Sequence, residues 1–242
     1  ALLLKAAALN TSFIERARFL RLLLDSADSD EIFQVYASVI MPILLTVKPR
    51  HDLIWFASSA TRASIAGGNY ILASEWLAVL AKTLDLDYEA SGSLLRLLPL
   101  IAIAGQPLPK PFSEEQATDV WSGLSDNFSR EDKEKRASRL LVLLSAMGIE
   151  PRAGAWKNVI SSKNIFEMEN IPATALRYQL LDAAKNNRIA EVVSISLIML
   201  GSEGPSKSGL VALNAVIRAL REIGLEADAR AIAIEAAISY VN

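Results

Sequence analysis

The only histidine of the chain, His51, is the first residue to consider for catalysis. A Ser-His-Asp triad uses one imidazole as its base, so such a triad could form only around this residue. His51 stands within residues 48–52, directly before an expected helix, where Asp52 is predicted to be the N-cap. We therefore expect a surface or capping role for this segment, and the sequence predicts no catalytic residue.

The remaining groups that could do chemistry are also explained by helix structure. Most acidic clusters stand where helices are expected to begin, and carboxylates there stabilise the positive end of the helix dipole. The clusters at expected helix starts are Asp28/Asp30/Glu31 and Glu114/Glu115. The third pair, Asp85/Asp87, lacks the Gly and the terminal Glu of a calcium loop. The chain has no Cys, which excludes disulfides and Cys-based zinc sites, and it has no Gly-rich phosphate loop. The sequence therefore predicts no metal and no cofactor.

Composition limits the class of protein. Hydrophobic residues make up 52% of the 242 residues and charged residues 21%, which is enough apolar content for a substantial core. The net charge of −2 argues against a dedicated nucleic-acid binder, which usually has a basic excess. The longest uncharged stretches, residues 32–47 and 97–109, are too short or too rich in Pro to cross a bilayer. We expect a soluble bacterial protein without a transmembrane span, in the cytoplasm or the periplasm.

Nearly every long segment has apolar residues at helical spacing, and the breaks between these segments recur regularly. Gly and Asn tolerate the left-handed backbone that ends a helix, so they mark most of the main turns. The main turns lie near Asp28, Gly68, Gly105, Gly148, Asn187 and Gly224, at spacings of 40, 37, 43, 39 and 37 residues. A second set of breaks falls near Pro49, Leu86, Asp126, Ile165 and Glu203. The two alternating sets predict an all-α chain of about six antiparallel helix hairpins, an α-solenoid.

Two positions inside the repeat also agree between hairpins. Five residues after a turn stand small or β-branched residues, namely Ala73, Ala153, Val192 and Ala229. Eight residues after a turn stand large apolar residues, namely Trp76, Trp156, Ile195 and Ile232. We predict that the first set lies where paired helices approach closely, and that the second set packs into the core.

One stretch resembles a known repeat family. Residues 68–76, Gly-Asn-Tyr-Ile-Leu-Ala-Ser-Glu-Trp, followed by Leu84-Asp85-Leu86-Asp87, resemble the second half of a tetratricopeptide repeat. The resemblance implies a right-handed superhelix of helix pairs that binds peptides or protein segments. The period near 39 departs from the 34 residues of that family, so the chain is interpreted as a divergent, tetratricopeptide-like solenoid. We expect one domain over residues 1–242, with a Pro-rich elbow at 105–112 that could divide it into two lobes.

Arginines recur near the same place in successive hairpins. They are Arg62, Arg96, Arg139, Arg177 and Arg218. If stacked hairpins bring them into a ladder, their guanidinium groups could pair with the carboxylates of an acidic peptide. Ordinary solubility, with each Arg lying over apolar surface, is the competing interpretation. The last helix is rich in Ala and Ile, and the chain opens with Leu2–Leu4. We therefore expect one or both apolar ends to be covered by another subunit, a further domain or loops.

We therefore expect a non-catalytic scaffold or adaptor that binds a protein or peptide. A helical domain beside a peptidoglycan-processing enzyme is the first alternative, and turnover of peptidoglycan would test it. An RNA-binding helical repeat is the second, because residues 148–151, Gly-Ile-Glu-Pro, are similar to the end of a pentatricopeptide unit. A salt-dependent RNA shift assay would separate it from the scaffold.

Overall fold

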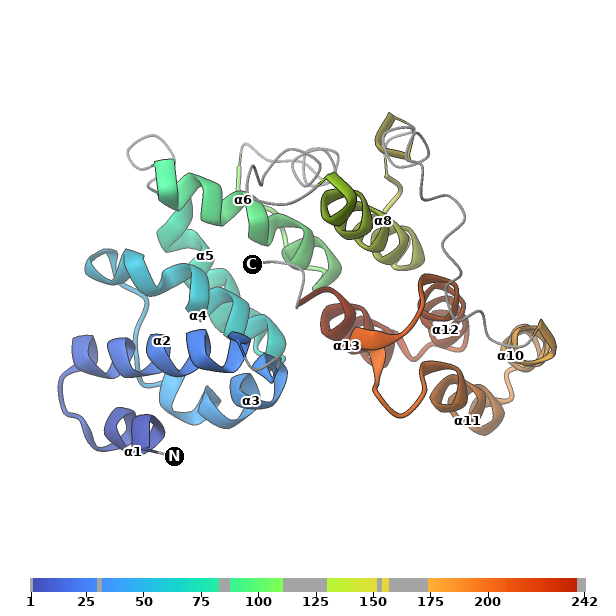
Figure 1. The fold of residues 1–242 in the computed structure, drawn as a ribbon, viewed down its shortest axis with the longest axis horizontal. Helices are drawn as coiled ribbons and strands as arrows, with labels where there is room; N and C mark the ends of the chain where they lie inside the picture. The colour runs from blue at the N-terminus through green and yellow to red at the C-terminus, as the bar shows by residue number, and fades with distance from the viewer. Residues whose placement is uncertain are drawn as a thin grey trace. The chain divides into compact units, whose positions relative to one another are not determined.

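The computed structural model describes residues 2–29, 32–82, 88–110, 130–151, 154–156 and 174–238, and every element within these ranges is a helix (Figure 1). The chain divides into two compact units. Unit 1 comprises Ala1–Ser113 with Val241–Asn242, and unit 2 comprises Glu114–Tyr240. In the part of the chain that the structure describes, no helix combines the length and apolar character needed to cross a membrane.

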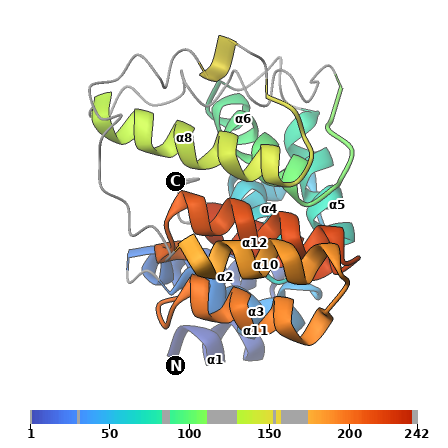
Figure 2. The same ribbon diagram turned by 90° about the vertical axis from the view of Figure 1, so that its right-hand side faces the viewer.

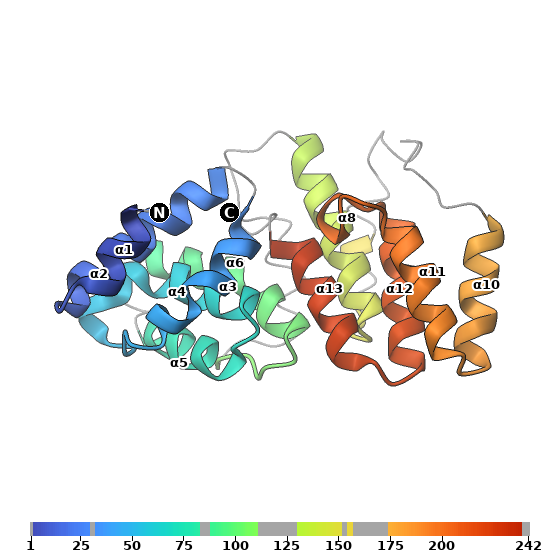
Figure 3. The same ribbon diagram turned by 90° about the horizontal axis from the view of Figure 1, so that it is seen from below.

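Unit 1 is built from helices that pack in the order of the sequence. Their bounds are α1 (Leu2–Leu9), α2 (Phe13–Ser29), α3 (Phe33–Leu44), the short 3₁₀ helix η1 (His51–Leu53), α4 (Ile54–Ala66), α5 (Tyr70–Ala81) and α6 (Tyr88–Ile103). Each α-helix packs against the next, and α4 also contacts both α2 and α6 (Figures 1 and 3). The contacts of unit 1 between helices adjacent in sequence are therefore compatible with a helical-repeat fold.

The centre of unit 1 is the contact between α4 and α5. Phe56 and Trp76 are fully buried there, and their rings meet edge to face with centroids 5.5 Å apart. Trp76 is the repeat position predicted to pack into the core, and this burial confirms the prediction for the α4/α5 hairpin.

Unit 2 departs from consecutive stacking. Its helices are α8 (Arg130–Ala146), α10 (Thr174–Lys185), α11 (Ile189–Leu200), the short 3₁₀ helix η2 (Pro205–Lys207), α12 (Leu210–Glu222) and α13 (Glu226–Ile238). A solenoid would place α10 beside α8, but α12 packs against α8 on one side and against α10 and α11 on the other (Figures 2 and 3). The α10/α11 and α12/α13 hairpins are therefore neighbours in space, as expected, whereas α8 packs mainly against α12 and α13 instead of α10.

The reason lies in the residues of α12. The apolar face predicted from helical spacing is buried, as Leu213 and Ile217 show. A second set, including Ala215, Val216 and Ala219, is buried as well, so the buried side of α12 is broad, while Arg218 and Glu222 are exposed on the other side. This broad side gives α12 enough apolar surface to contact α8 as well as α10 and α11.

The main turns are confirmed at five of their six predicted positions. The left-handed residues are Gly68, Gly105, Gly148, Asn187 and Gly224, with φ between 53° and 82°. Each ends its helix with the same pair of backbone hydrogen bonds, as in Gly68 N to Ile65 O and Asn69 N to Ser64 O, the Schellman arrangement. The sixth turn, predicted near Asp28, lies slightly later in the chain, because α2 ends at Ser29 and α3 begins at Phe33.

Other repeat predictions have mixed outcomes. The small positions Ala73, Val192 and Ala229 are fully buried, as expected, and Ile195 is buried in the core. Trp156 and Ile232 are partly exposed, so their assignment to the core is wrong. Pro49 and Glu203 lie in connections between helices. The predictions at Leu86, Ala153, Asp126 and Ile165 lie outside the described residues.

The Pro-rich stretch connects the two units. Residues 105–110 follow α6 without helical structure, and the division between the units falls after Ser113. Residues 111 and 112 lie outside the described ranges. That both units belong to one solenoid domain over 1–242 stays a prediction.

Candidate interaction surface

The second helix of the α10/α11 hairpin has an apolar surface that no described helix covers. Its inward side, with Val192, Ile195 and Met199, packs in the core of unit 2. Its outward side carries Ile189, Val193, Leu197 and Ile198, and the last two are 66% and 62% exposed. We call these four residues the α11 face. Because α11 has only one charged residue, Glu191, it is apolar on both sides.

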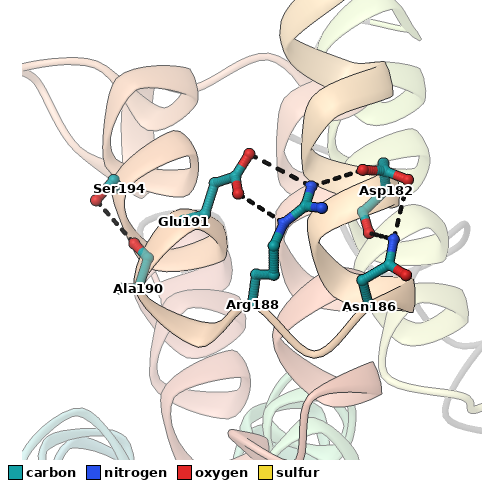
Figure 4. Close-up of polar contacts among 6 residues, drawn as sticks. All are labelled: Asp182, Asn186, Arg188, Ala190, Glu191 and Ser194. Atoms are coloured by element: carbon teal, nitrogen blue, oxygen red, sulfur yellow. Dashed lines mark hydrogen bonds and ion pairs between the residues drawn. The ribbon is translucent and has the colours of Figure 1, made fainter.

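The α11 face is continuous along the helix. Ile189, Val193 and Leu197 recur every four residues, which places them on one side of the helix. Nine residue steps from Ile189 to Ile198 at ~1.5 Å give the face a length of about 14 Å. Ser194 lies among these side chains, and its hydroxyl donates to the Ala190 carbonyl oxygen at 2.8 Å (Figure 4). A partner can therefore cover the face without leaving this hydroxyl unsatisfied.

The turn at one end of the α11 face carries a polar cluster (Figure 4). Arg188 bridges the two helices, with Nη2 2.6 Å from Asp182 Oδ2 and Nε 2.7 Å from Glu191 Oε2. Asn186 Nδ2 donates to the carboxylate and to the carbonyl oxygen of Asp182. The hydrogen bond that Arg188 donates to the Asp182 carboxylate raises the pKa of Arg188 above its usual value, so this guanidinium stays charged. The cluster forms a polar margin beside the apolar face.

The neighbouring helix α10 is also exposed on its outer side. Tyr178 is 72% exposed and Leu181 is 43% exposed, and the two residues are three apart, on one side of α10. Together with the α11 face, they leave the outer hairpin of unit 2 unusually apolar for a surface in contact with water.

The structure places the five predicted arginines in different environments. Arg62 is only 8% exposed, and its guanidinium carbon lies 3.9 Å from the centre of the Phe33 ring. This cation–π contact joins α4 to α3 within the core of unit 1. Arg96 belongs to the same unit, on α6, and is exposed. Of these two residues, only Arg96 lies at a surface.

The other three arginines belong to unit 2. Arg139 of α8 donates to the carbonyl oxygens of Ser206 (3.3 Å) and Ser208 (3.0 Å), which holds α8 against the start of α12. Arg177 of α10 and Arg218 of α12 are exposed. The ladder stays a hypothesis, and the exposed side chains available to it are those of Arg96, Arg177 and Arg218.

His51 is exposed at the start of η1, in keeping with the surface role predicted for it. Asp52 is not an N-cap, because it lies within η1 and its carboxylate pairs with Arg50 at 3.0 Å. Among the residues that the structure describes, no three His, Asp or Glu side chains gather in a way that could hold a metal ion. Asp85/Asp87 and Glu114/Glu115 lie outside those residues.

The first and last helices of the chain differ in how much apolar surface they expose. The last helix, α13, buries Ala233, Ile234 and Ala237 within unit 2, where it packs against α12 and α8. Leu2 and Leu9 of α1 are exposed. That another subunit, a further domain or loops cover one or both ends stays a prediction. The apolar face left open in unit 2 belongs to α11, which the sequence marks by a single charge in 12 residues.

Comparison of the chain with known protein families, curated proteins and solved structures finds no match.

Proposed function

We propose that this protein is a non-catalytic helical-repeat scaffold, tetratricopeptide-like in its hairpin construction, whose α11 face binds an apolar segment of a partner protein. The observation that carries the proposal is the set of large, uncharged, exposed side chains along α11. A helix that is apolar all round is normally buried, so this face is suited to being covered by another polypeptide.

The margin of the surface supports a protein as its occupant. Protein interfaces combine an apolar centre with a polar rim. The Arg188 cluster lies beside the α11 face as such a rim would. We favour an amphipathic helix of the partner, because a face about 14 Å long matches between two and three helical turns. The helix would place its apolar side against Val193 and Leu197.

The repeated turns support the helical-repeat part of the proposal. Five Schellman turns recur at a mean spacing of about 39 residues, and helices adjacent in the sequence of unit 1 contact one another, as they would in a helical repeat. The insertion of α12 beside α8 makes unit 2 an irregular member of such a series. Peptidoglycan processing and RNA binding stay alternatives that no described residue favours.

Affinity capture from the native cell, followed by binding measurements with the purified partner, tests the proposal. Replacing Leu197 and Ile198 together by Glu is expected to weaken binding at least tenfold, because two carboxylates would have to lose water on binding. Both positions are exposed, so the substitutions leave the fold intact, which circular dichroism checks.

Ala227→Glu is the matched control, because Ala227 is exposed on α13 of the same unit and lies outside the α11 face. Its affinity for the partner should equal that of the unchanged protein. Equal affinity of the Leu197→Glu/Ile198→Glu protein would contradict the proposal. Light scattering could instead show self-association that the same pair of substitutions abolishes. That result would mean that the α11 face binds a second copy of this chain and not a different protein.

A further inference from the structure

Unit 1 contains an open groove of about 800 Å³ between two hairpins. One wall is the connection that follows α3, with Leu45, Lys48 and Pro49, and the other is α5 from its N-cap Asn69 to its C-cap Lys82. Thirteen residue steps at ~1.5 Å make the α5 wall about 20 Å long. An extended chain rises ~3.3 Å per residue, so this wall accommodates about six residues.

Large apolar side chains are exposed on both walls. Ile71 of α5 is 77% exposed and Leu45 is 54% exposed. Ala78 and Val79 continue the apolar lining along α5. A polypeptide lying in the groove would remove these side chains from water, which is the main source of affinity for such a site.

The charges of the groove favour an acidic ligand. Its charged lining residues are Lys48, Lys82 and Glu75, a net charge of +1. Both lysines are exposed, and neither has a carboxylate within ion-pair distance among the described residues. In the same unit, Arg18 and Arg50 each pair with a neighbouring carboxylate. Among the described residues, the groove therefore presents ammonium groups without an ion-pair partner beside apolar surface.

We propose that this groove binds a short extended segment of a partner protein that combines apolar side chains with carboxylates. The apolar side chains lie against Leu45 and Ile71, and the carboxylates pair with Lys48 and Lys82. A basic segment would bring like charges together at both lysines, and a segment without apolar side chains would leave Ile71 uncovered. The groove belongs to unit 1 and is separate from the α11 face, so it adds a second binding site to the proposed scaffold.

Selection of random heptapeptides displayed on phage, with the full chain as target, tests this inference. The enriched sequences should carry at least one Asp or Glu together with Leu, Ile, Val or Phe. A synthetic, fluorescein-labelled copy of the strongest peptide then provides the probe for titration by fluorescence anisotropy. Affinity should fall at least tenfold with Ile71→Glu, and also with Lys48→Glu and Lys82→Glu combined.

Two matched controls separate the groove from general effects of charge. Val35→Glu introduces the same carboxylate at an apolar residue of α3 that is 62% exposed and lies outside the groove. Lys5→Glu reverses an exposed lysine of α1. Each should change the affinity of the peptide less than twofold.

The inference would be overturned by enriched peptides that are basic, by peptides whose affinity is unchanged in Ile71→Glu, or by a selection that enriches nothing. Peptides that lose affinity only for the Leu197→Glu/Ile198→Glu protein would map to the α11 face. That result would reject the groove and leave the proposed function standing. Loss confined to the groove variants would support the inference independently of the α11 face.

Discussion

Replacing Gly148 by Ala tests how the end of α8 is held against α12. Gly148 has a φ of 81°, and a Cβ built there would lie 2.9 Å from both terminal nitrogens of Arg221. Arg221 Nη1 donates to the carbonyl oxygen of Ala146 at 2.8 Å, so this guanidinium closes the last turn of α8. The new methyl group would therefore displace an interaction between two helices.

The expected cost has two parts. An L-residue in the left-handed region costs about 1 kcal/mol relative to Gly. Loss of the Arg221 hydrogen bond adds about 1 kcal/mol, so Gly148→Ala should lower the free energy of unfolding by about 2 kcal/mol. Gly224 is the matched control, because its φ is 82° and its Cβ would meet no atom within 4 Å. Gly224→Ala should cost only the first part, about 1 kcal/mol.

Urea unfolding followed by circular dichroism measures the free energy of unfolding of both variants. Their transition midpoints can be compared directly if the m-value is unchanged. In an Arg221→Ala background the cost of Gly148→Ala should fall to that of Gly224→Ala, a coupling of about 1 kcal/mol. Equal costs for the two glycine variants, or no coupling to Arg221, would refute this description of the contact between α8 and α12.

Three further changes have defined outcomes. Asn187→Ala should lower the free energy of unfolding by about 1 kcal/mol in urea titrations, and Asn187→Gly should change it by less than about 0.5 kcal/mol, because φ is 53° there. Arg139→Met should cost about 1–2 kcal/mol in the same assay, since two backbone carbonyl oxygens, of Ser206 and Ser208, lose their donor. Burial raises the pKa of Glu235, so the folded state binds more protons above about pH 4.5 and stability falls as the pH rises through the folded pKa. The free energy of unfolding of Glu235→Gln in urea titrations should therefore exceed that of the unchanged protein at pH 7 by less than about 1 kcal/mol. This difference should vanish near pH 4.

The helix ends could be predicted from the sequence because they depend on single residues. Gly68, Gly105, Gly148 and Gly224 end their helices for a local reason, the missing Cβ, and Asn187 does so through its tolerance of positive φ. These signals need no knowledge of the neighbouring helices.

The order of packing in unit 2 could not be predicted in the same way. The small residues Ala215 and Ala219 give α12 a second buried side, but Ala is compatible with either core or surface. The position of Arg62 has a similar cause. Arg62 is buried because the Phe33 ring of α3 packs against it. The spacing of residues within α4 cannot predict a contact with a ring on another helix. Only the lack of charge in α11 could have indicated the α11 face beforehand.

Site-specific photo-crosslinking from Leu197, performed in the cell that makes this protein, tests the central claim most directly. A photoreactive amino acid at Leu197 should form one major adduct with a partner protein, and a second at Val193 should label the same apolar segment. The same group at Ala227, on α13, should give no such adduct. Adducts from Leu197 no stronger than those from Ala227, or adducts only with a second copy of this chain, would contradict a partner-binding role for the α11 face.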